Sequence, residues 1–410
     1  MNTNADTEAP ARSVDEAIAA LLRAARPIED TELLATADVL GRVLAIDVQA
    51  DSDLPRFDNS AVDGYALAAA DVPFALADGV PVSGRYPAGA PGGLLEPRHA
   101  ARVFTGSCLP AGTDCVVPQE LCEWNGNRLR LLRPPRVGEN VRRRGEDVRQ
   151  GHLALLRGSQ LRPQDLAIAA AVGRAELVVY RRLRVGILCT GNELVKPGQA
   201  AVEGRIFDAN TALLTGLLQT QGCSLSAVRH AADDLDATSA MLEGLAAASD
   251  VIITAGGASV GEEDYLRRAI DRCGRIEFWR VAIKPGKPFA FGRIAWVPLL
   301  GLPGNPTSAL VTFCVLVRPF LRRLRGMDEV LPAPISLPAG FDRPAGVRRE
   351  YLRVHLEAAA DEPVLVLSGS QSSGVLSAAV RAQGLAVVLE GRAVRAGDRL
   401  DYYSFDQLLS

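Results

Sequence analysis

Residues 249–264 read Ser-Asp-Val-Ile-Ile-Thr-Ala-Gly-Gly-Ala-Ser-Val-Gly-Glu-Glu-Asp. The β-branched run at 251–253 predicts a strand that is buried on both faces. Two glycines end that strand, and a helical pattern follows over about 262–273, with Gly274 placed to end the helix. A strand, a glycine-rich turn and a helix are typical of an open parallel sheet, in which ligands bind at the carboxyl ends of the strands.

The glycine-rich turn indicates a place where the backbone can approach an anion, because glycine lacks a side chain and the start of a helix offers free N–H groups. Gly256 and Gly261 have the spacing of a P-loop, but Glu262 stands where that loop needs lysine. The dinucleotide pattern G-x-G-x-x-G is also missing. Taken alone, the stretch fits a tight turn that only joins two elements equally well.

The alternation of strand and helix extends over 183–325. Strands are predicted at 183–189, 224–229, 250–254, 276–282, 289–293 and 296–301, and helices at 209–221, 235–248, 262–273 and 306–325. Short buried strands joined through helices predict a parallel-type sheet with helices on both faces. The fold class is therefore α/β, within a multidomain chain.

The flanking sequence predicts further domains. Ser13 and Glu16 form a capping box for a helix over about 14–26, a short helix is expected at 31–40, and a helix at 163–172 is expected to pack back on the first one. Short runs of strand-forming residues between Gly, Pro and Asn turns predict two β-rich regions. We expect a discontinuous helical domain at 13–50 and 143–180, an inserted β-domain at 51–142, the α/β domain at 181–328, and a C-terminal β-domain at 329–410.

Composition excludes several classes of partner. The chain has 410 residues and a formal net charge of −3, so no overall field favours nucleic acid or an anionic membrane. No apolar run approaches the roughly 20 residues that span a bilayer, and no signal-peptide pattern opens the sequence. The seven cysteines form no C-x-x-C pair, which predicts reduced thiols in a cytoplasmic protein.

Two polar segments each allow two interpretations. Residues 51–64 place four acids among Pro, Asn and Gly, so the segment fits a solvated loop with Asx-turns or a carboxylate-lined loop for a divalent cation or a polar substrate. Residues 138–148 mix arginines with acids. They fit a solvated cluster of ion pairs, or an anion- or metal-binding edge that faces another subunit.

Other strand-end turns resemble the first. In Leu302-Pro303-Gly304-Asn305-Pro306-Thr307-Ser308, Asn305 is a good N-cap and Pro306 a good first helical residue. Lys284-Pro285-Gly286-Lys287-Pro288 puts two cations on a turn framed by prolines, which fits solvent-facing charges or an anion site. Thr190-Gly191-Asn192-Glu193-Leu194 adds an acid after another strand, and Asp233 and Asp234 follow a further one.

Taken together, these motifs resemble one family, the molybdopterin molybdenumtransferases, which are the MoeA-type molybdenum insertases related to the E domain of gephyrin. Six segments match in the family's order: Phe-Asp-Asn-Ser-Ala-Val-Asp-Gly-Tyr-Ala at 57–66, Arg-Arg-Gly-Glu-Asp at 143–147, Thr-Gly-Asn-Glu-Leu at 190–194, Gly-Gly-Ala-Ser-Val-Gly at 256–261, Lys-Pro-Gly-Lys-Pro at 284–288 and Pro-Gly-Asn-Pro at 303–306. Each segment is weak alone, and the ordered set is specific.

The resemblance implies an elongated homodimer with its active site between the α/β domain of one subunit and the β-domain of the other. It also implies a reaction in which molybdenum from molybdate enters the dithiolene of adenylylated molybdopterin and AMP is released, assisted by a divalent cation, usually Mg²⁺. The partners it implies are the molybdopterin adenylyltransferase and other proteins of molybdenum cofactor biosynthesis.

For the site, the resemblance implies that Asp63, Glu193 and Asp264 bind the cation or position the substrate, since hard oxygen ligands suit magnesium. Lys284 and Lys287 are expected to hold anions at the catalytic centre. The other expected substrate-binding residues are Thr105, Ser107, Asp147, Thr190, Gly191, Asp233, Asp234, Gly256, Gly257, Ser259, Gly261, Pro303, Gly304, Asn305, Pro306 and Ser308.

The sequence departs from the family pattern at two positions. Ala255 stands where relatives often carry Ser or Thr, and Asn192 replaces a frequent Asp, which puts details of substrate binding in doubt. Two other functions stay open. A molybdopterin adenylyltransferase shares the α/β domain but leaves the flanking segments unexplained. A non-catalytic scaffold like gephyrin at synapses is disfavoured by the intact acid and lysine motifs.

Overall fold

The computed structural model describes residues 11–125, 127–200, 203–256 and 265–409. The chain forms two compact units. Unit 1 comprises the described residues of Met1–Glu32, Gly41–Val43 and Tyr180–Ser410, and unit 2 comprises those of Leu33–Leu40 and Leu44–Val179. In the part of the chain that the structure describes, no helix is long and apolar enough to cross a membrane.

Unit 1 is built on a sheet with the strand order β16-β13-β17-β21-β20-β18. These strands are β13 (Arg184–Thr190), β16 (Ser224–Ala231), β17 (Val251–Ala255), β18 (Gly274–Trp279), β20 (Ala290–Ile294) and β21 (Val297–Leu302). The first four strands in the sheet order run parallel. The prediction of a parallel sheet is wrong for β20, which is antiparallel to both of its neighbours, β21 and β18, because Ala295 and Trp296 join β20 to β21 as a tight hairpin.

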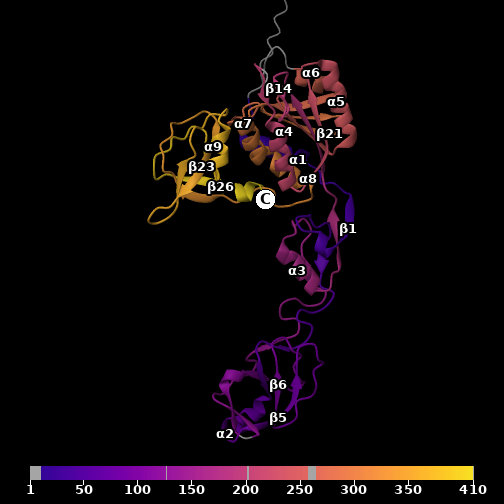
Figure 1. Ribbon diagram of the computed structural model, residues 1–410, viewed down its shortest axis with the longest axis vertical. Coiled ribbons are helices and arrows are strands. Elements are labelled where there is room, and N and C mark those ends of the chain that lie inside the picture. The colour runs from indigo at the N-terminus through magenta and orange to yellow at the C-terminus, as the bar shows by residue number, and fades with distance from the viewer. Residues whose placement is uncertain (1–10, 126, 201–202, 257–264, 410) are drawn as a thin grey trace, which may run out of the picture. The chain divides into compact units, whose positions relative to one another are not determined.

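Helices cover both faces of this sheet (Figure 1). The helices α5 (Leu235–Ala248) and α6 (Tyr265–Cys273) pack on one face, and α1 (Val14–Ala24), α4 (Asn210–Thr220) and the helical segment 306–324 pack on the other. Successive strand residues point to opposite faces, so Ile252 joins the core under α5 while Ile253 joins the core under α4. Both side chains are fully buried, as expected for a central parallel strand.

The segment 306–324 is less regular than the predicted helix at 306–325. It consists of α7 (Pro306–Thr312), a π-helical stretch (Phe313–Val317) and α8 (Arg318–Leu324). Pro319 lacks the N–H that an α-helix would direct to the preceding turn, and a π-helical stretch is one way to absorb that loss.

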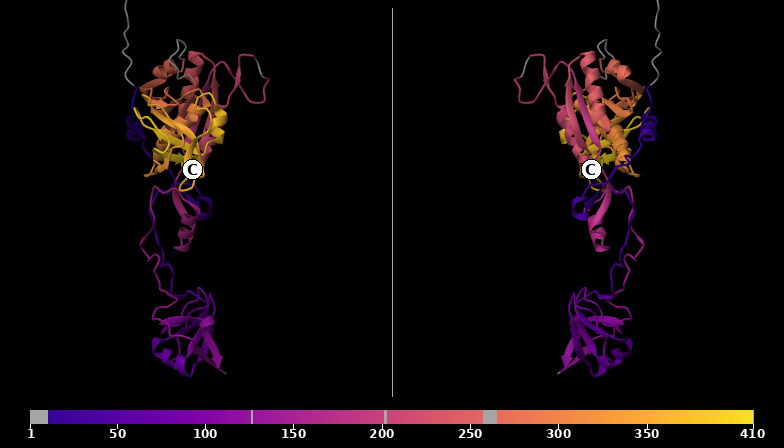
Figure 2. Two further views of the ribbon diagram at one scale, coloured as in Figure 1. Left: turned by 90° about the vertical axis from the view of Figure 1, so that its left-hand side faces the viewer. Right: turned by 90° about the vertical axis from the view of Figure 1, so that its right-hand side faces the viewer.

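The C-terminal sheet of unit 1 has the order β19-β23-β25-β26-β22, with β24 also paired to β23. Its elements are β19 (Ile283–Lys284), β22 (Ile335–Pro338), β23 (Arg349–Glu357), β24 (Val364–Leu367), α9 (Leu376–Arg381), β25 (Gly384–Val388), β26 (Arg399–Ser404) and α10 (Phe405–Leu409). This sheet, yellow in Figure 2, lies beside α7, where Thr307 Oγ1 donates to the carbonyl of Val375 at 3.4 Å. The turn at 284–288 therefore reaches the C-terminal sheet through β19.

Unit 2 contains a sheet with the order β7-β4-β6-β5-β9-β8. Its elements are β4 (Gly64–Leu67), α2 (Val72–Ala77), β5 (Val80–Tyr86), β6 (Ala100–Val103), β7 (Cys115–Pro118), β8 (Cys122–Asn125) and β9 (Arg128–Leu131). The rest of unit 2 includes β1 (Thr31–Ala35), β2 (Val48–Gln49), β3 (Asn59–Ser60), β10 (Val141–Arg142), β11 (Leu153–Leu155), α3 (Pro163–Ala171) and β12 (Glu176–Tyr180), with a separate apolar core around Leu44 and Ala169.

Two expectations for the N-terminal region are wrong. The predicted helix at 31–40 is the strand β1, paired with β12, followed by a 3-10 turn at Thr36–Asp38. Such a short helix is marginal in water, and a strand partner satisfies the backbone better. The helix α1, capped by Ser13 and Glu16 as predicted, packs on α8 in the core of unit 1, whereas α3, expected to share a domain with it, belongs to the separate core of unit 2. The four-domain boundaries remain predictions.

Candidate functional site

A pocket of about 780 Å³ opens at the carboxyl edge of the central sheet of unit 1. The chain runs from β13 outward to β16 and then back to β17 on the other side of β13, so the sheet has its switch point between β13 and β17. Thr190 ends β13 and Gly191 follows it, Gly256 follows β17, and Pro303 follows β21. All four residues line the pocket. Ligands of open α/β sheets bind at such points.

The pocket gathers most of the predicted unit 1 residues. Its lining is Thr190, Gly191, Glu193, Leu194, Ile206, Asn210, Asp233, Ala255, Gly256, Lys284, Pro285, Gly286, Lys287, Pro288, Pro303, Gly304, Asn305, Ser308, Arg348, Gln371, Ser372 and Ser373. The lining includes three basic side chains, Lys284, Lys287 and Arg348, and two acidic ones, Glu193 and Asp233. The pocket therefore carries a positive excess, which favours an anionic ligand.

Lysine is rare in this chain, which makes its placement informative. Three lysines are present, at 196, 284 and 287, whereas arginine supplies the other basic residues. Two of the three line the pocket. A lysine ammonium is a compact point charge with three rotatable donors, suited to phosphate groups.

At two turns that line the pocket, glycine is required because there is no space for a side chain. Gly256 has φ +93°, and a Cβ there would lie 2.5 Å from the carbonyl oxygen of Thr190. Gly286 has φ +113°, and a Cβ there would lie 2.4 Å from Thr312 Cγ2. Any other residue would strain the backbone and displace a neighbouring segment at both turns.

The acidic side consists of Glu193 and Asp233, with Asn192 between them. The backbone N–H of Asn192 donates to Asp233 Oδ2 at 3.4 Å, and Asn192 Oδ1 accepts from the N–H of Asp233 at 3.2 Å. Asp234 has another task, because its carboxylate accepts from the N–H of Ala237 at 2.7 Å and caps α5. Among the described residues, no cluster of three or more His, Cys, Asp or Glu side chains could hold a metal ion.

Two buried polar atoms at the pocket have no partner among the described residues. They are Thr190 Oγ1 and Asn210 Oδ1. Asn210 Nδ2 is engaged, since it donates to the carbonyl of Gly304 at 2.6 Å and holds the 303–306 turn. Asn305 occupies the N-cap position of α7, but its side chain does not cap the helix. Its amide donates instead to Ser373 Oγ at 3.2 Å.

The sequence reasoning missed a serine-rich loop from the C-terminal sheet. Gln371, Ser372 and Ser373 line the pocket. Arg353, which is fully buried on β23, donates through Nη2 to the carbonyls of Ser370 at 3.1 Å and Ser372 at 3.3 Å. Its Nε and Nη1 have no partner in the described part of the chain. The run Ser-Gly-Ser-Gln-Ser-Ser-Gly at 368–374 was the available signal.

The expected site residues of unit 2 form a cluster of their own. Asp63 Oδ1 accepts from the N–H and from Oγ1 of Thr105, each at 2.8 Å, and these bonds hold the pKa of Asp63 below its ordinary value. Ser107 is buried, and its hydroxyl accepts from the N–H of Phe104 at 3.0 Å. Asp147 is exposed, and its N–H donates to the carbonyl of Leu54 at 3.0 Å.

The two ambiguous polar segments of the sequence pair with each other. Arg143 Nη1 lies 2.6 Å from Asp58 Oδ2, and Arg144 forms an ion pair with Asp53. These contacts support the interpretation of a solvated ion-pair cluster for those residues. Four expected site residues, Gly257, Ser259, Gly261 and Asp264, lie outside the described residues.

Fold and pocket together define a multidomain α/β protein with a lysine-bearing pocket at the switch point of its sheet. Family models agree with this class along nearly the whole chain. The MoeA N-terminal region (domain I and II) matches residues 12–173, the probable molybdopterin binding domain matches 186–323, and the MoeA C-terminal region (domain IV) matches 337–405. The chain belongs to the MoeA family of molybdopterin molybdenumtransferases.

Relatives of known name cover most of the chain. The molybdopterin molybdenumtransferase of Haemophilus influenzae is 36% identical over 385 residues, which are 92% of this chain and 95% of that protein. Molybdopterin molybdenumtransferase 2 of Mycobacterium tuberculosis is 37% identical over 367 residues, 84% of this chain and 88% of that protein. The crystal structure of the MoeA protein of Pyrococcus horikoshii OT3 superimposes with a TM-score of 0.82 at 28% identity, covering 96% of this chain and all of that one.

Proposed function

We propose that this protein inserts molybdenum from molybdate into adenylylated molybdopterin and releases AMP. The observation that carries the proposal is the pocket of unit 1, where strand-end turns, two of the three lysines and a serine-rich loop meet at the switch point of the sheet. Both substrates are anions, and the relatives are named for molybdenum transfer to molybdopterin.

The anion-binding groups of the pocket divide into two sets. Lys287 and the start of α7 lie at the sheet edge, where the N–H groups of a first helical turn favour a phosphate. Ser372 and Ser373, on the loop braced by Arg353, offer hydroxyl donors of the kind that bind a tetrahedral oxyanion. We assign the first set to the phosphates of adenylylated molybdopterin and the second to molybdate, which places the two substrates in one cavity.

The acidic groups fit a cation on the substrate. Glu193 and Asp233 supply carboxylate oxygens in the pocket, and oxygen ligands suit magnesium. Magnesium, when bound, would neutralise charge on the phosphoanhydride as its P–O bond breaks. We retain Asp63, Glu193 and Asp264 as proposed ligands, and we propose that Lys284 and Lys287 orient the phosphates and stabilise the charge on the leaving AMP.

We further propose that the protein acts in the cytoplasm as a homodimer, in sequence with a molybdopterin adenylyltransferase that supplies its substrate. In the proposed dimer, each substrate site contains Lys287 from one subunit and is completed by Asp63 and Thr105 from the other subunit. The hydrogen bonds from Thr105 lower the pKa of Asp63 and so favour its ionised form, which is the form that binds a cation.

The reaction is tested with the purified full chain, adenylylated molybdopterin and molybdate. AMP is measured by chromatography and cofactor by activation of an apo-molybdoenzyme. AMP release that depends on molybdate is the expected result. Adenylylation of molybdopterin by ATP without any need for molybdate would assign the chain to the adenylyltransferase class instead.

Shared sites are tested with mixed dimers. Asp63→Asn and Lys287→Gln subunits are each expected to have strongly reduced activity alone, whereas co-expressed subunits should regain activity, because one of the two sites in a mixed dimer is intact. Mixed dimers as inactive as either parent would contradict the shared site and leave the reaction itself untouched.

A further inference from the structure

A small cavity in unit 1 is walled by arginines. Its lining is Arg42, Val43, Tyr180, Arg181, Arg182, Gly222 and Arg325, and it shares no residue with the substrate pocket. The lining comes from segments distant in sequence: the chain at 41–43, the chain at 180–182, the turn after α4 and the C-cap of α8. Four guanidinium groups at one cavity need an explanation, because like charges repel.

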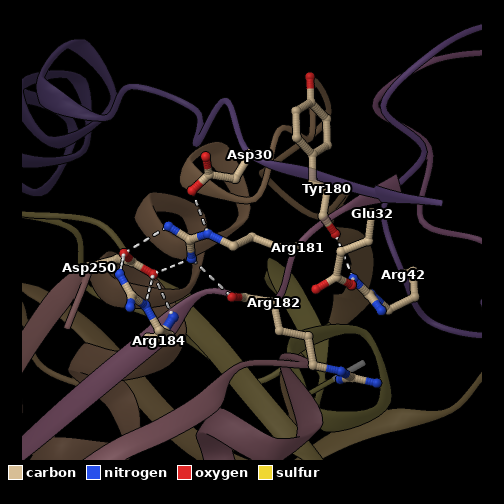
Figure 3. Close-up of polar contacts among 8 residues, drawn as sticks. All are labelled: Asp30, Glu32, Arg42, Tyr180, Arg181, Arg182, Arg184 and Asp250. Atoms are coloured by element: carbon tan, nitrogen blue, oxygen red, sulfur yellow. Dashed lines mark hydrogen bonds and ion pairs between the residues drawn. The ribbon is translucent and has the colours of Figure 1, made fainter. Parts of the chain in front are cut away.

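Two of the four arginines are neutralised by carboxylates (Figure 3). Arg42 forms an ion pair with Glu32 and also donates to the carbonyl of Tyr180 at 2.8 Å. Arg181 Nη1 lies 2.6 Å from Asp250 Oδ2, and Arg181 Nε lies 2.7 Å from Asp30 Oδ2. Arg184 also pairs with Asp250, at 2.9 Å.

The other two have no carboxylate within ion-pair distance among the described residues. Arg182 Nη1 donates to the carbonyl of Gly222 at 3.2 Å, and Arg325 Nη2 donates to the carbonyl of Gly41 at 3.1 Å. Arg325 is only 4% exposed, and its Nη1 is buried without a hydrogen-bond partner. The cluster of five guanidinium groups and three carboxylates, counted over the described residues, is left with two positive charges in excess.

A buried guanidinium without a counter-charge is costly. Burial lowers the pKa of Arg325, the nearby Cys223 works in the opposite direction, and the positive charges of Arg182 and Arg42 lower it further. Glycine at 222 keeps space beside this group, because a Cβ there would lie 3.0 Å from Arg325 Nη2.

We propose that this cavity is a halide site, in which a chloride ion accepts hydrogen bonds from Arg325 Nη1 and is held by the uncompensated positive charge of Arg325 and Arg182. The cavity volume of about 10 Å³ admits one particle of roughly the size of water. Among anions, a monoatomic halide comes nearest to that size, whereas phosphate or sulfate, with four oxygens each, exceeds it. The excess of positive charge favours an anion over water.

A bound chloride adds a contact between chain segments that hydrogen bonds already join, among them Tyr180 N–H to the carbonyl of Val43 at 2.9 Å. The segments 41–43 and 180–182 both border unit 2 in sequence, and Arg325 ends α8. Because only the folded chain assembles these groups, chloride stabilises the folded state by mass action.

The test is thermal unfolding of the full chain at constant ionic strength, with sodium chloride replaced stepwise by sodium gluconate, whose anion is too large for the cavity. We expect the unfolding midpoint to rise with chloride and to saturate. Arg325→Met should lose this shift, whereas Arg205→Gln, at an exposed arginine of unit 1 outside the cavity, should keep it. If Arg325→Met does not fold, Arg182→Gln, whose side chain is exposed, should move the half-saturating chloride concentration several-fold upward.

Diffraction from bromide-soaked crystals gives a readout that needs no variant. An anomalous peak beside Arg325 Nη1 is expected. A non-anomalous water in the cavity, equal midpoints in chloride and gluconate, or the same chloride shift in Arg325→Met as in the unaltered chain would each overturn the proposal.

Discussion

Lys284 Nζ lies 2.9 Å from Glu350 Oε1, and this ion pair ties the lysine-bearing turn to the C-terminal sheet. The two residues are also opposite each other in the parallel pairing of β19 with β23, so backbone register sets the contact. Glu350 is 8% exposed and accepts a second hydrogen bond from Arg343 Nε at 2.8 Å. Lys287 has no ion-pair partner among the described residues, so it is the lysine more available to a ligand.

Stability should depend on the ionisation of Glu350. Burial raises the pKa of Glu350, but hydrogen bonds from Arg343 and Lys284 outweigh it and hold the pKa below 4.5. A carboxylate with a depressed pKa stabilises the fold above its unfolded pKa, and this stability is lost as pH falls through the folded pKa. We expect Glu350→Gln to cost about 1–3 kcal/mol at pH 7 and to weaken the acid dependence below pH 4.5.

Urea unfolding at a series of pH values measures both effects. The matched control is Glu362→Gln, which breaks an exposed ion pair with Arg399 and should change little. An acid dependence that is the same in Glu350→Gln and in the unaltered chain would contradict the assignment.

Lys287→Gln should lower kcat/KM about 10- to 100-fold in the AMP-release assay, because one charge-assisted hydrogen bond is worth roughly 1.5–3 kcal/mol and each 1.36 kcal/mol is tenfold. Lys196→Gln is the control, since it removes the same charge from an exposed lysine outside the pocket. Equal activities of the two variants would remove Lys287 from the site.

Arg353→Met should raise the KM for molybdate about tenfold or more, with a smaller effect on the KM for adenylylated molybdopterin. Arg353 braces the loop that carries Ser372 and Ser373, so its loss should disorder the hydroxyl donors assigned to the oxyanion. Arg395→Met, at an exposed arginine in the connection between β25 and β26, is the control. An unchanged KM for molybdate in a folded Arg353→Met protein would refute this role.

Gly256→Ala should destabilise the protein by about 1–3 kcal/mol and reduce substrate binding. The added Cβ would meet the carbonyl oxygen of Thr190 at 2.5 Å, on a backbone with φ +93°. Gly216→Ala is the matched control, because Gly216 lies inside α4 with nothing within 4 Å of a Cβ, and there alanine should stabilise by about 0.5–1 kcal/mol. Guanidinium unfolding compares the two, and a neutral Gly256→Ala would mean that the turn tolerates a side chain.

The local pattern of apolar residues was sufficient to predict most helices and strands of unit 1. The helix expected at 235–248 is α5 over those residues, and the strand expected at 250–254 is β17 at Val251–Ala255. Helical period and β-branched runs report on neighbours within a few residues, so they are readable from the sequence. The helix expected at 31–40 failed because β12, far along the chain, pairs with that segment as a strand.

The site shows the same division. Glycine and lysine turns mark strand ends in the sequence, and Gly256, Lys287 and Pro303 do meet in one pocket. Asp234, chosen with Asp233 from the sequence, caps α5 instead. Arg353 was not predicted, because a buried arginine on a strand has no local sequence signature. Its role depends on the loop that it holds through hydrogen bonds.

The alternation of strands and helices, the glycine turns at the strand ends and the family can all be read from the amino-acid sequence, because each depends on residues close together along the chain. The packing of distant segments set three other features: β20 runs antiparallel to both of its neighbours, Lys284 is held by Glu350, and a serine-rich loop completes the pocket. Those features depend on which distant segments pack together, and packing is a property of the whole folded chain.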